Sequence, residues 1–193
     1  MDEPDDITLG DFNLLEMPVS IRQIGDSRDR ELAWQFFVFF SRMEYALKRS
    51  RYLVKGKIPA EPDWDAFANK HDNQFCGLLS PKAEKKVSAE SLKRLETAVV
   101  YFQQSPPRKQ IVEGGALGWS EPQSKNDGEN VLRWLLRVVR IVRNNLFHGG
   151  KFPGSPVNDP SRDRQLLTNS ITVLIAAELL DPEVRGHVEE TIA

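Results

Sequence analysis

This sequence is poor in cysteine and in long apolar stretches. Cys76 is the single cysteine among 193 residues, so the chain cannot form an internal disulfide or a cysteine-rich zinc site, and we expect it in a reducing compartment. No apolar stretch approaches the roughly 20 residues that span a bilayer, and the first residues are acidic, whereas a secretion signal begins with basic residues. We therefore expect a cytoplasmic protein that has no membrane contact and that needs no metal ion or other cofactor.

Net charge is also small. The 26 Lys and Arg residues against 28 Asp and Glu residues give a formal charge of -2, which excludes a protein that coats nucleic acid through overall positive charge. Any contact with RNA must then be local, so the position of the arginines along each helix is more informative than their total. The Gly114-Gly115 pair lacks the Gly-Lys-Ser/Thr of a phosphate-binding loop, and ATP binding finds no support.

The composition is that of an ordinary soluble globular protein, with 40% hydrophobic and 28% charged residues. A chain of 193 residues is long enough for one domain with a hydrophobic core. We divide it into an irregular N-terminal arm (1–26), a helical domain (27–180) and a C-terminal tail (181–193) that has room for one short extra turn.

Apolar residues recur at three- and four-residue steps in five segments, which predicts five helices. The expected helices are 27–54, a weaker one between Pro62 and Pro81, one that follows Ser88 and ends before Pro106, 129–147 and 161–180. With no internal repeat and no run of strands, this pattern predicts an all-α fold, an antiparallel helical bundle of about five helices.

The expected helix ends depend on capping residues and breakers. The first helix is expected to end near Gly56, and Asp127 and Asp159 are available as N-caps of the last two helices. Residues 106–128 are too rich in Gly, Pro and polar residues for a helix, and we expect a small hairpin or a lid there.

The fourth expected helix is strongly amphipathic. Its apolar face holds Trp134, Leu135, Val138, Val142 and Leu146. The opposite face gathers Arg133, Arg137, Arg140 and Asn144, with Arg143 and His148 at its two margins. A charged face of this kind is more often simply a solvated surface than a binding site.

The end of this helix is less ordinary. Two asparagines and then His148 stand before Gly149-Gly150, where good helix formers would let a structural helix continue. His148 is thus expected at a helix C-terminus, where carbonyl groups favour the charged imidazolium and the adjacent turn leaves the ring accessible. An ordinary C-capping histidine would give the same pattern.

The segment Arg143-Asn144-Asn145-Leu146-Phe147-His148-Gly149 resembles the signature of the HEPN superfamily, which is an arginine, a polar residue that is often asparagine, a short spacer and a histidine. The resemblance implies a helical dimer in which two such motifs meet in a cleft. Many members are ribonucleases of toxin-antitoxin, phage-defence and RNA-processing systems, and others keep the fold without activity. Matched to the motif, Arg143 and His148 take the catalytic positions and Asn144 the adjacent polar one.

The chemistry of RNA cleavage suits these residues. RNA carries its own nucleophile in the 2′-OH, so cleavage needs proton transfer, for which histidine is suited, and stabilisation of added negative charge, for which arginine is suited. Residues Arg140, Arg137 and Arg133 then extend the phosphate-binding surface. We expect a metal-independent endoribonuclease, a homodimer with RNA as substrate and a separate antitoxin or regulatory protein as a further partner. The alternative is a non-catalytic HEPN module that binds RNA, nucleotide or protein in the dimer cleft.

Three further features of the sequence carry weaker expectations. Arg42 and Glu44 interrupt the aromatic stripe of the first helix and are candidates to line the same cleft, although an ordinary surface salt bridge is the commoner meaning. The pair His71-Asp72 has no further ligands nearby and is interpreted as a surface pair in preference to a metal site. The first helix also has more aromatic residues than one buried stripe needs, so some of them are expected to face a second chain. These are Trp34, Phe36, Phe37, Phe39 and Phe40.

Overall fold

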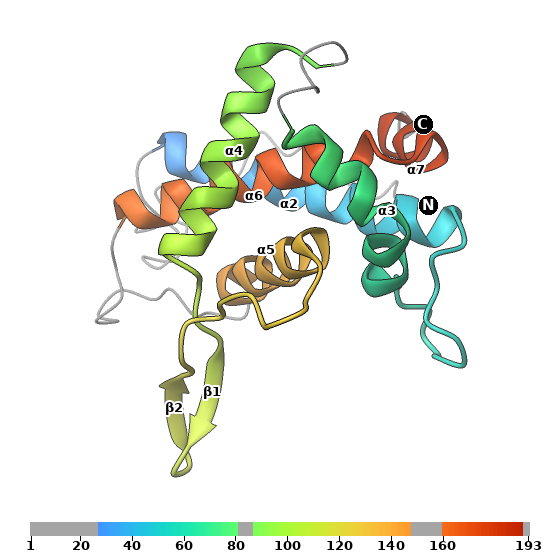
Figure 1. Ribbon diagram of the computed structural model, residues 1–193. Coiled ribbons are helices and arrows are strands. Elements are labelled where there is room, and N and C mark those ends of the chain that lie inside the picture. Colours follow the sequence, from blue (N-terminus) through green and yellow to red (C-terminus); the bar gives the residue numbers. More distant parts are fainter. Residues whose placement is uncertain (1–26, 81–86, 148–159, 191–193) are drawn as a thin grey trace, which may run out of the picture.

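A computed structural model of the chain describes residues 27–80, 87–147 and 160–190. These residues form six helices and one two-stranded antiparallel sheet (Figure 1). The elements are α2 (Ser27–Arg49), α3 (Trp64–Leu78), α4 (Ala89–Gln104), β1 (Gln110–Glu113), β2 (Ala116–Trp119), α5 (Val131–Phe147), α6 (Pro160–Glu178) and α7 (Pro182–Glu189). The expected mostly helical fold is therefore confirmed. Within the described residues, no helix is both long enough and apolar enough to cross a membrane.

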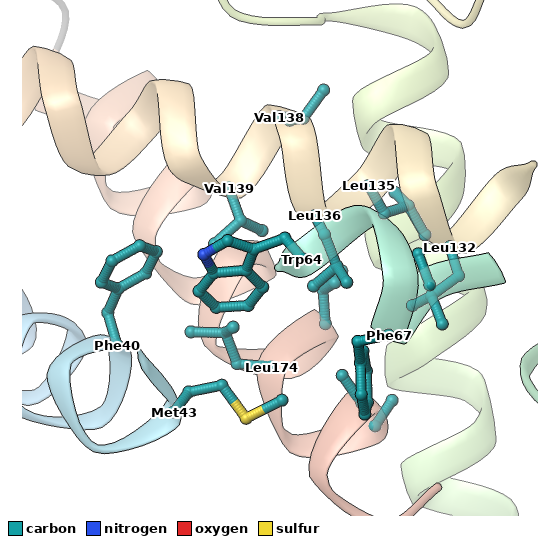
Figure 2. Close-up of a cluster of buried hydrophobic side chains, with 14 of the residues drawn as sticks. Phe40, Met43, Trp64, Phe67, Leu132, Leu135, Leu136, Val138, Val139 and Leu174 are labelled. Atoms are coloured by element: carbon teal, nitrogen blue, oxygen red, sulfur yellow. The ribbon is translucent and has the colours of Figure 1, made fainter. Parts of the chain in front are cut away.

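Helix α5 packs on α3 and α6, and α6 packs in turn on α2 and α4 (Figure 1). The predicted apolar face of α5 is confirmed, because Trp134, Leu135 and Val138 are fully buried and Val142 is nearly so. Figure 2 shows three further buried residues of α5, Leu132, Leu136 and Val139, facing Trp64 and Phe67 of α3 and Leu174 of α6. Phe40 and Met43 of α2 complete this cluster. Burying a large apolar side chain stabilises the fold by about 1.5–3 kcal/mol, so this cluster fixes the position of α5 within the molecule.

Helix α2 ends at Arg49, five residues before the expected end. Arg51 adopts a left-handed conformation with φ 66°, and the backbone N–H of Tyr52 donates to the carbonyl of Leu47 at 2.9 Å. This is the Schellman arrangement, in which glycine usually takes the left-handed position. The expected end near Gly56 was wrong because an arginine occupies the position that glycine normally marks.

The other helix ends depend partly on side chains from distant segments. Ser88 caps α4 as expected, accepting from the N–H of Ser91. At the start of α5, the carboxylate of Asp72 on α3 accepts from the N–H of Leu132 at 3.0 Å, whereas Asp127 was the expected cap. Helix α7 is longer than the single extra turn that the sequence suggests, and Asp181 is its N-cap.

The segment between α4 and α5 contains the expected hairpin. Strands β1 and β2 join through Gly114 and Gly115, which both have positive φ (59° and 83°), as a tight two-residue turn requires. Figure 1 shows the hairpin standing out from the helices. Val112 and Leu117 face each other across its strands, and they are 79% and 70% exposed.

His71 is 5% exposed, so the interpretation of His71-Asp72 as a surface pair was wrong. The Nε2 atom of His71 lies 3.0 Å from the hydroxyl of Tyr52 and 3.2 Å from a carboxylate oxygen of Asp181. Its Nδ1 atom lies 2.6 Å from the Gln74 amide oxygen. The Tyr52 hydroxyl also donates to Asp181 at 2.7 Å and accepts from Lys70 at 2.8 Å. These partners come from three separate segments, so the residues next to His71 in the chain carry no sign of its burial.

The contacts around Tyr52 also shift the pKa values of Tyr52 and Asp181. Burial alone would raise the pKa of Asp181, but hydrogen bonds from Tyr52 and from the backbone N–H groups of Glu183 and Val184 outweigh it and lower that pKa. Burial raises the pKa of Tyr52, so its hydroxyl keeps its proton and remains a donor. The cluster therefore attaches α7 to the segment between α2 and α3.

Candidate functional site

The motif that resembles the HEPN signature, residues 143–149, begins in the last turns of α5. Arg143, Asn144 and Asn145 lie within the helix, whose last residue is Phe147. His148 and Gly149 follow directly in the chain but lie outside the described residues. The part of the motif with a described geometry is therefore its arginine and its two asparagines.

Arg143 is half-buried between α5 and α2. Its guanidinium carbon lies 5.6 Å from the centre of the Phe40 ring, within the range of a cation–π contact. Its Nη1 atom donates to the side-chain oxygen of Asn144 at 3.2 Å, and Asn144 itself is exposed. These contacts help to hold the guanidinium in a defined position at the end of the helix, and the neighbouring Asn144 is accessible to solvent.

Asn145 has the opposite environment. It is 9% exposed, and its Nδ2 atom donates to the backbone carbonyl of Arg108 at 2.7 Å. Arg108 lies just before β1, so this bond attaches the base of the hairpin to the motif helix. The side chains of Arg108 and Lys109 are exposed there. Sequence reasoning missed this connection, and the doubled asparagine was the only sign of it.

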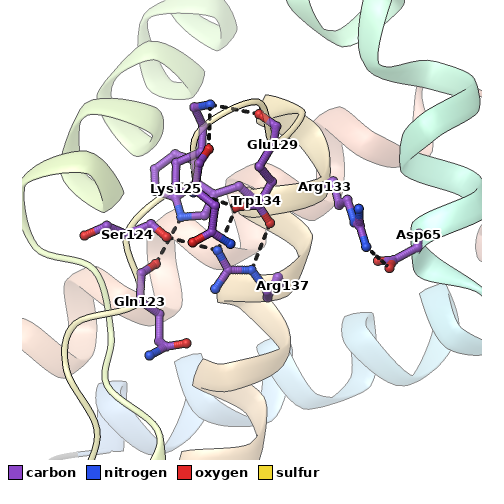
Figure 3. Close-up of polar contacts among 9 residues, drawn as sticks. Asp65, Gln123, Ser124, Lys125, Glu129, Arg133, Trp134 and Arg137 are labelled. Atoms are coloured by element: carbon purple, nitrogen blue, oxygen red, sulfur yellow. Dashed lines mark hydrogen bonds and ion pairs between the residues drawn. The ribbon is translucent and has the colours of Figure 1, made fainter.

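Two of the three predicted RNA-contacting arginines face carboxylates (Figure 3). Arg133 donates to Asp65 of α3 at 2.6 Å, and this contact raises the pKa of Arg133. Arg137 donates to both carboxylate oxygens of Glu129, at 3.0 and 2.8 Å, and to the carbonyl of Ser124. Burial alone would raise the pKa of Glu129, but the bonds from Arg137 and from a backbone N–H outweigh it and lower that pKa.

These ion pairs rank the arginines by how readily they can bind phosphate. The Arg133 pair is exposed and worth at most about 1 kcal/mol, so phosphate can replace its carboxylate. The Arg137 pair is two-pronged and largely buried, and it holds the loop before α5 in place. Arg140 is exposed and makes no hydrogen bond or ion pair with the rest of the described chain. Arg140 is therefore the most available of the three.

The two candidate residues on α2, Arg42 and Glu44, lie on different sides of that helix. Arg42 donates to the carbonyl of Val188 near the end of α7 at 3.2 Å. It lies about 200° around α2 from Phe40, so the structure does not bring it to Arg143. Glu44 lies one turn after Phe40 on the same side of α2, is half-buried and forms no ion pair with other described residues.

No group of three or more His, Cys, Asp or Glu residues in the described ranges is placed to hold a metal ion. Comparisons with protein-family models, with curated proteins and with solved structures find no match for this chain. The motif at the end of α5 and the contacts around it are therefore the features that point to a function.

Proposed function

We propose that this protein is a metal-independent endoribonuclease of the HEPN type that acts as a homodimer through the 2′-OH of RNA. The observation that supports it most is the fixed position of Arg143, which Phe40 and Asn144 hold at the end of α5. An arginine in a fixed position loses little entropy when it binds phosphate, and its planar guanidinium matches two phosphate oxygens. His148, which follows α5 in the chain, is the proposed proton-transfer group.

In the proposed reaction the 2′-oxygen attacks the adjacent phosphorus while the bond from phosphorus to the 5′-oxygen breaks. The 2′-OH gives up its proton, the leaving 5′-oxygen takes one, and a 2′,3′-cyclic phosphate remains on the 5′ fragment. Arg143 stabilises the charge that develops on the phosphoryl oxygens. One helix end supplies one histidine, and a two-fold dimer supplies the second for the opposite proton transfer.

The dimer has its own support on the surface of the described residues. Trp34 is 60% exposed, and its ring lies 5.7 Å from that of half-buried Phe37 on the same helix. Exposed aromatic surface of this kind is typical of protein contacts. We expect light scattering at micromolar concentration to give twice the mass of one chain. A monomer under these conditions would contradict both the dimer and the composite site.

Cutting of a mixed RNA in the presence of chelator tests the activity. We expect cutting by the wild type, a cyclic phosphate product, and no cutting of RNA whose 2′-OH is blocked. Arg143→Ala and His148→Ala should each abolish cutting, and Arg143→Lys should cut poorly because an ammonium cannot make the two-pronged contact. Arg94→Ala, an exposed change on α4, is the matched control and should cut normally. Retained cutting by His148→Ala would contradict the assignment of the site.

The second candidate is a non-catalytic HEPN module that uses the same cleft for RNA, nucleotide or protein. The observation that favours it is the exposed apolar pair Val112 and Leu117 on the hairpin, a surface suited to binding a partner. The base of this hairpin is bonded to α5 through Asn145 and Arg108. A wild-type protein that binds RNA or a partner but cuts no RNA would favour this candidate.

Under the first candidate, the protein acts in the cytoplasm as a toxin or phage-defence effector, restrained by a separate antitoxin or regulatory protein.

A further inference from the structure

The strongest local concentration of positive charge in the sequence lies at the end of α2, outside the motif. Residues 48–57, here called the basic segment, hold five basic residues and no acidic one. The five are Lys48, Arg49, Arg51, Lys55 and Lys57. The whole chain, in contrast, has 26 basic and 28 acidic residues. This is a local feature of the kind that a nearly neutral protein needs in order to contact a polyanion.

The basic segment has an ordered backbone. Tyr52 within it is buried, and its backbone N–H and carbonyl bond to Leu47 and Asp63 at 2.9 and 2.8 Å. The N–H of Val54 donates to the carbonyl of Glu61 at 3.0 Å. The exposed cations around Tyr52 are thus presented from a fixed framework, which reduces the entropy lost on binding.

Arg51 occupies a position where glycine would be the easier choice. Its φ of 66° disfavours any side chain with a Cβ atom, yet the chain places a long cation there. Arg51 is also exposed. A charge kept at a strained position indicates that the charge itself contributes something other than stability.

The cations of the basic segment are largely unengaged. Arg49, Arg51 and Lys55 are exposed and form no side-chain hydrogen bond or ion pair with other described residues. Lys57 faces Glu61 at 3.5 Å, in an exposed pair that contributes little. In this respect the basic segment differs from Arg133 and Arg137, whose charges carboxylates already balance.

Helix α2 connects the basic segment to the motif. Arg143 contacts α2 at Phe40, and Lys48 lies eight residues further along the same helix. At about 1.5 Å per residue this is about 12 Å, a span that several nucleotides of one RNA strand can bridge. Lys48 lies about 80° around the helix from Phe40, on the side that also carries Glu44, whereas Arg49 lies about 180° around from Phe40.

We propose that the basic segment is a second RNA-binding surface, which holds the phosphate backbone of the substrate away from the scissile bond. This inference rests on the proposed function, because it names where the same RNA continues beyond Arg143. Single-stranded RNA is commonly held by a basic track that follows its backbone over about 4–16 nucleotides. The segment offers cations and few base-reading groups, so binding here is independent of base sequence.

An anionic membrane fits the same surface less well. A lipid-binding loop places its cations around an apolar tip that enters the bilayer. Here Ile58 is 98% exposed, but Glu61 and Asp63 follow it closely, and most of the cations lie on the α2 side of the segment. Two carboxylates near the apolar tip would repel anionic lipid.

The test measures binding without cutting, by fluorescence anisotropy of a labelled single strand of about 16 nucleotides with every 2′-OH methylated. Binding is followed between about 50 and 200 mM salt. The test variant is Arg49→Gln with Lys55→Gln. The matched control is Lys93→Gln with Arg94→Gln, which changes the same residue types and the same net charge on the exposed face of α4.

For the test variant, we expect weaker binding at every salt concentration and a slope of log affinity against log salt that is smaller by about 1.4, or about 0.7 per lost contact. The control should match the wild type. Arg51→Gly removes a further charge and also relieves the left-handed backbone, so it should weaken RNA binding without lowering the melting temperature. This variant separates lost binding from lost folding.

Three results would overturn the proposal, and they are distinguishable from failure of the proposed function. Wild-type affinity in the test variant, while Arg143→Ala still abolishes cutting, would leave the ribonuclease and remove the basic segment from it. Equal losses in test and control variants would show only a general charge effect. Loss of binding to vesicles containing phosphatidylserine, with RNA binding unchanged, would assign the surface to membranes. A wild type that neither binds nor cuts RNA would overturn both proposals.

Discussion

The two neighbouring asparagines of the motif should respond in opposite ways to truncation. Asn145→Ala removes the 2.7 Å hydrogen bond to the carbonyl of Arg108 at a position that is 9% exposed. Leaving a partly buried carbonyl without its donor costs about 1–3 kcal/mol. Alanine returns about 0.5 kcal/mol through its higher helix propensity. We therefore expect Asn145→Ala to lose about 1–2 kcal/mol of unfolding free energy, whereas exposed Asn144→Ala should change it by less than about 0.5 kcal/mol.

Urea unfolding at neutral pH measures this difference. With a slope of about 2 kcal/mol per molar urea, Asn145→Ala should lower the midpoint by about 0.5–1 M and leave the slope unchanged. Amide hydrogen exchange should also become faster in β1, because the bond joins α5 to the segment before that strand. Cutting should fall more in Asn144→Ala, which removes an acceptor that helps to position Arg143. Equal destabilisation by Asn144→Ala and Asn145→Ala would contradict the structural role of the bond from Asn145 to Arg108.

Two further predictions concern buried polar contacts. The lowered pKa of Glu129 means that its contribution is present above its unfolded pKa of about 4.3 and is lost as pH falls through the lower folded pKa. Glu129→Gln, which leaves Arg137 without its carboxylate, should cost about 1.5–3 kcal/mol at pH 7, and its urea midpoint should converge with that of the wild type as pH falls below the lowered folded pKa of Glu129. Tyr52→Phe, which loses the bond to Asp181, should cost a similar amount, whereas exposed Tyr45→Phe should be neutral; equal midpoints for the two tyrosine variants would contradict the buried cluster.

Helix positions could be predicted from the sequence because periodicity and breakers act locally. Ser88 bonds to a group three residues away, and its cap was correctly expected. The end of α2 was missed because Arg51 takes the left-handed position that glycine usually marks. His71 was misjudged because its burial depends on Tyr52 and Asp181, which lie 19 and 110 residues away. Nothing in the neighbouring residues encodes such contacts.

In the candidate site, too, only the features that local helical spacing determines were predictable. Helical spacing correctly placed Arg133 and Arg140 on the exposed side of α5, but it could not show that Asp65 from another helix faces Arg133. Spacing also could not distinguish the roles of the two asparagines, because the partner of Asn145 comes from the hairpin segment. The basic segment escaped notice because a helix continuing to residue 54 would distribute its cations around the axis. Ending the helix at Arg49 places them instead on one ordered turn.

The first turn of α5 is completed by residues that the chain supplied some sixty positions earlier. Asp72 accepts from its Leu132 N–H, Asp65 pairs with its Arg133, and the Asn130 side chain just before it donates to Asn69 of α3. Helix α5, which carries the motif, therefore depends on α3 and should not fold in the same way when it is separated from it. A fragment from α4 onward would hold the whole Arg-to-His motif yet lack the groups that start its helix and also Phe40 of α2, which contacts Arg143, so a chain able to display the motif needs both α2 and α3.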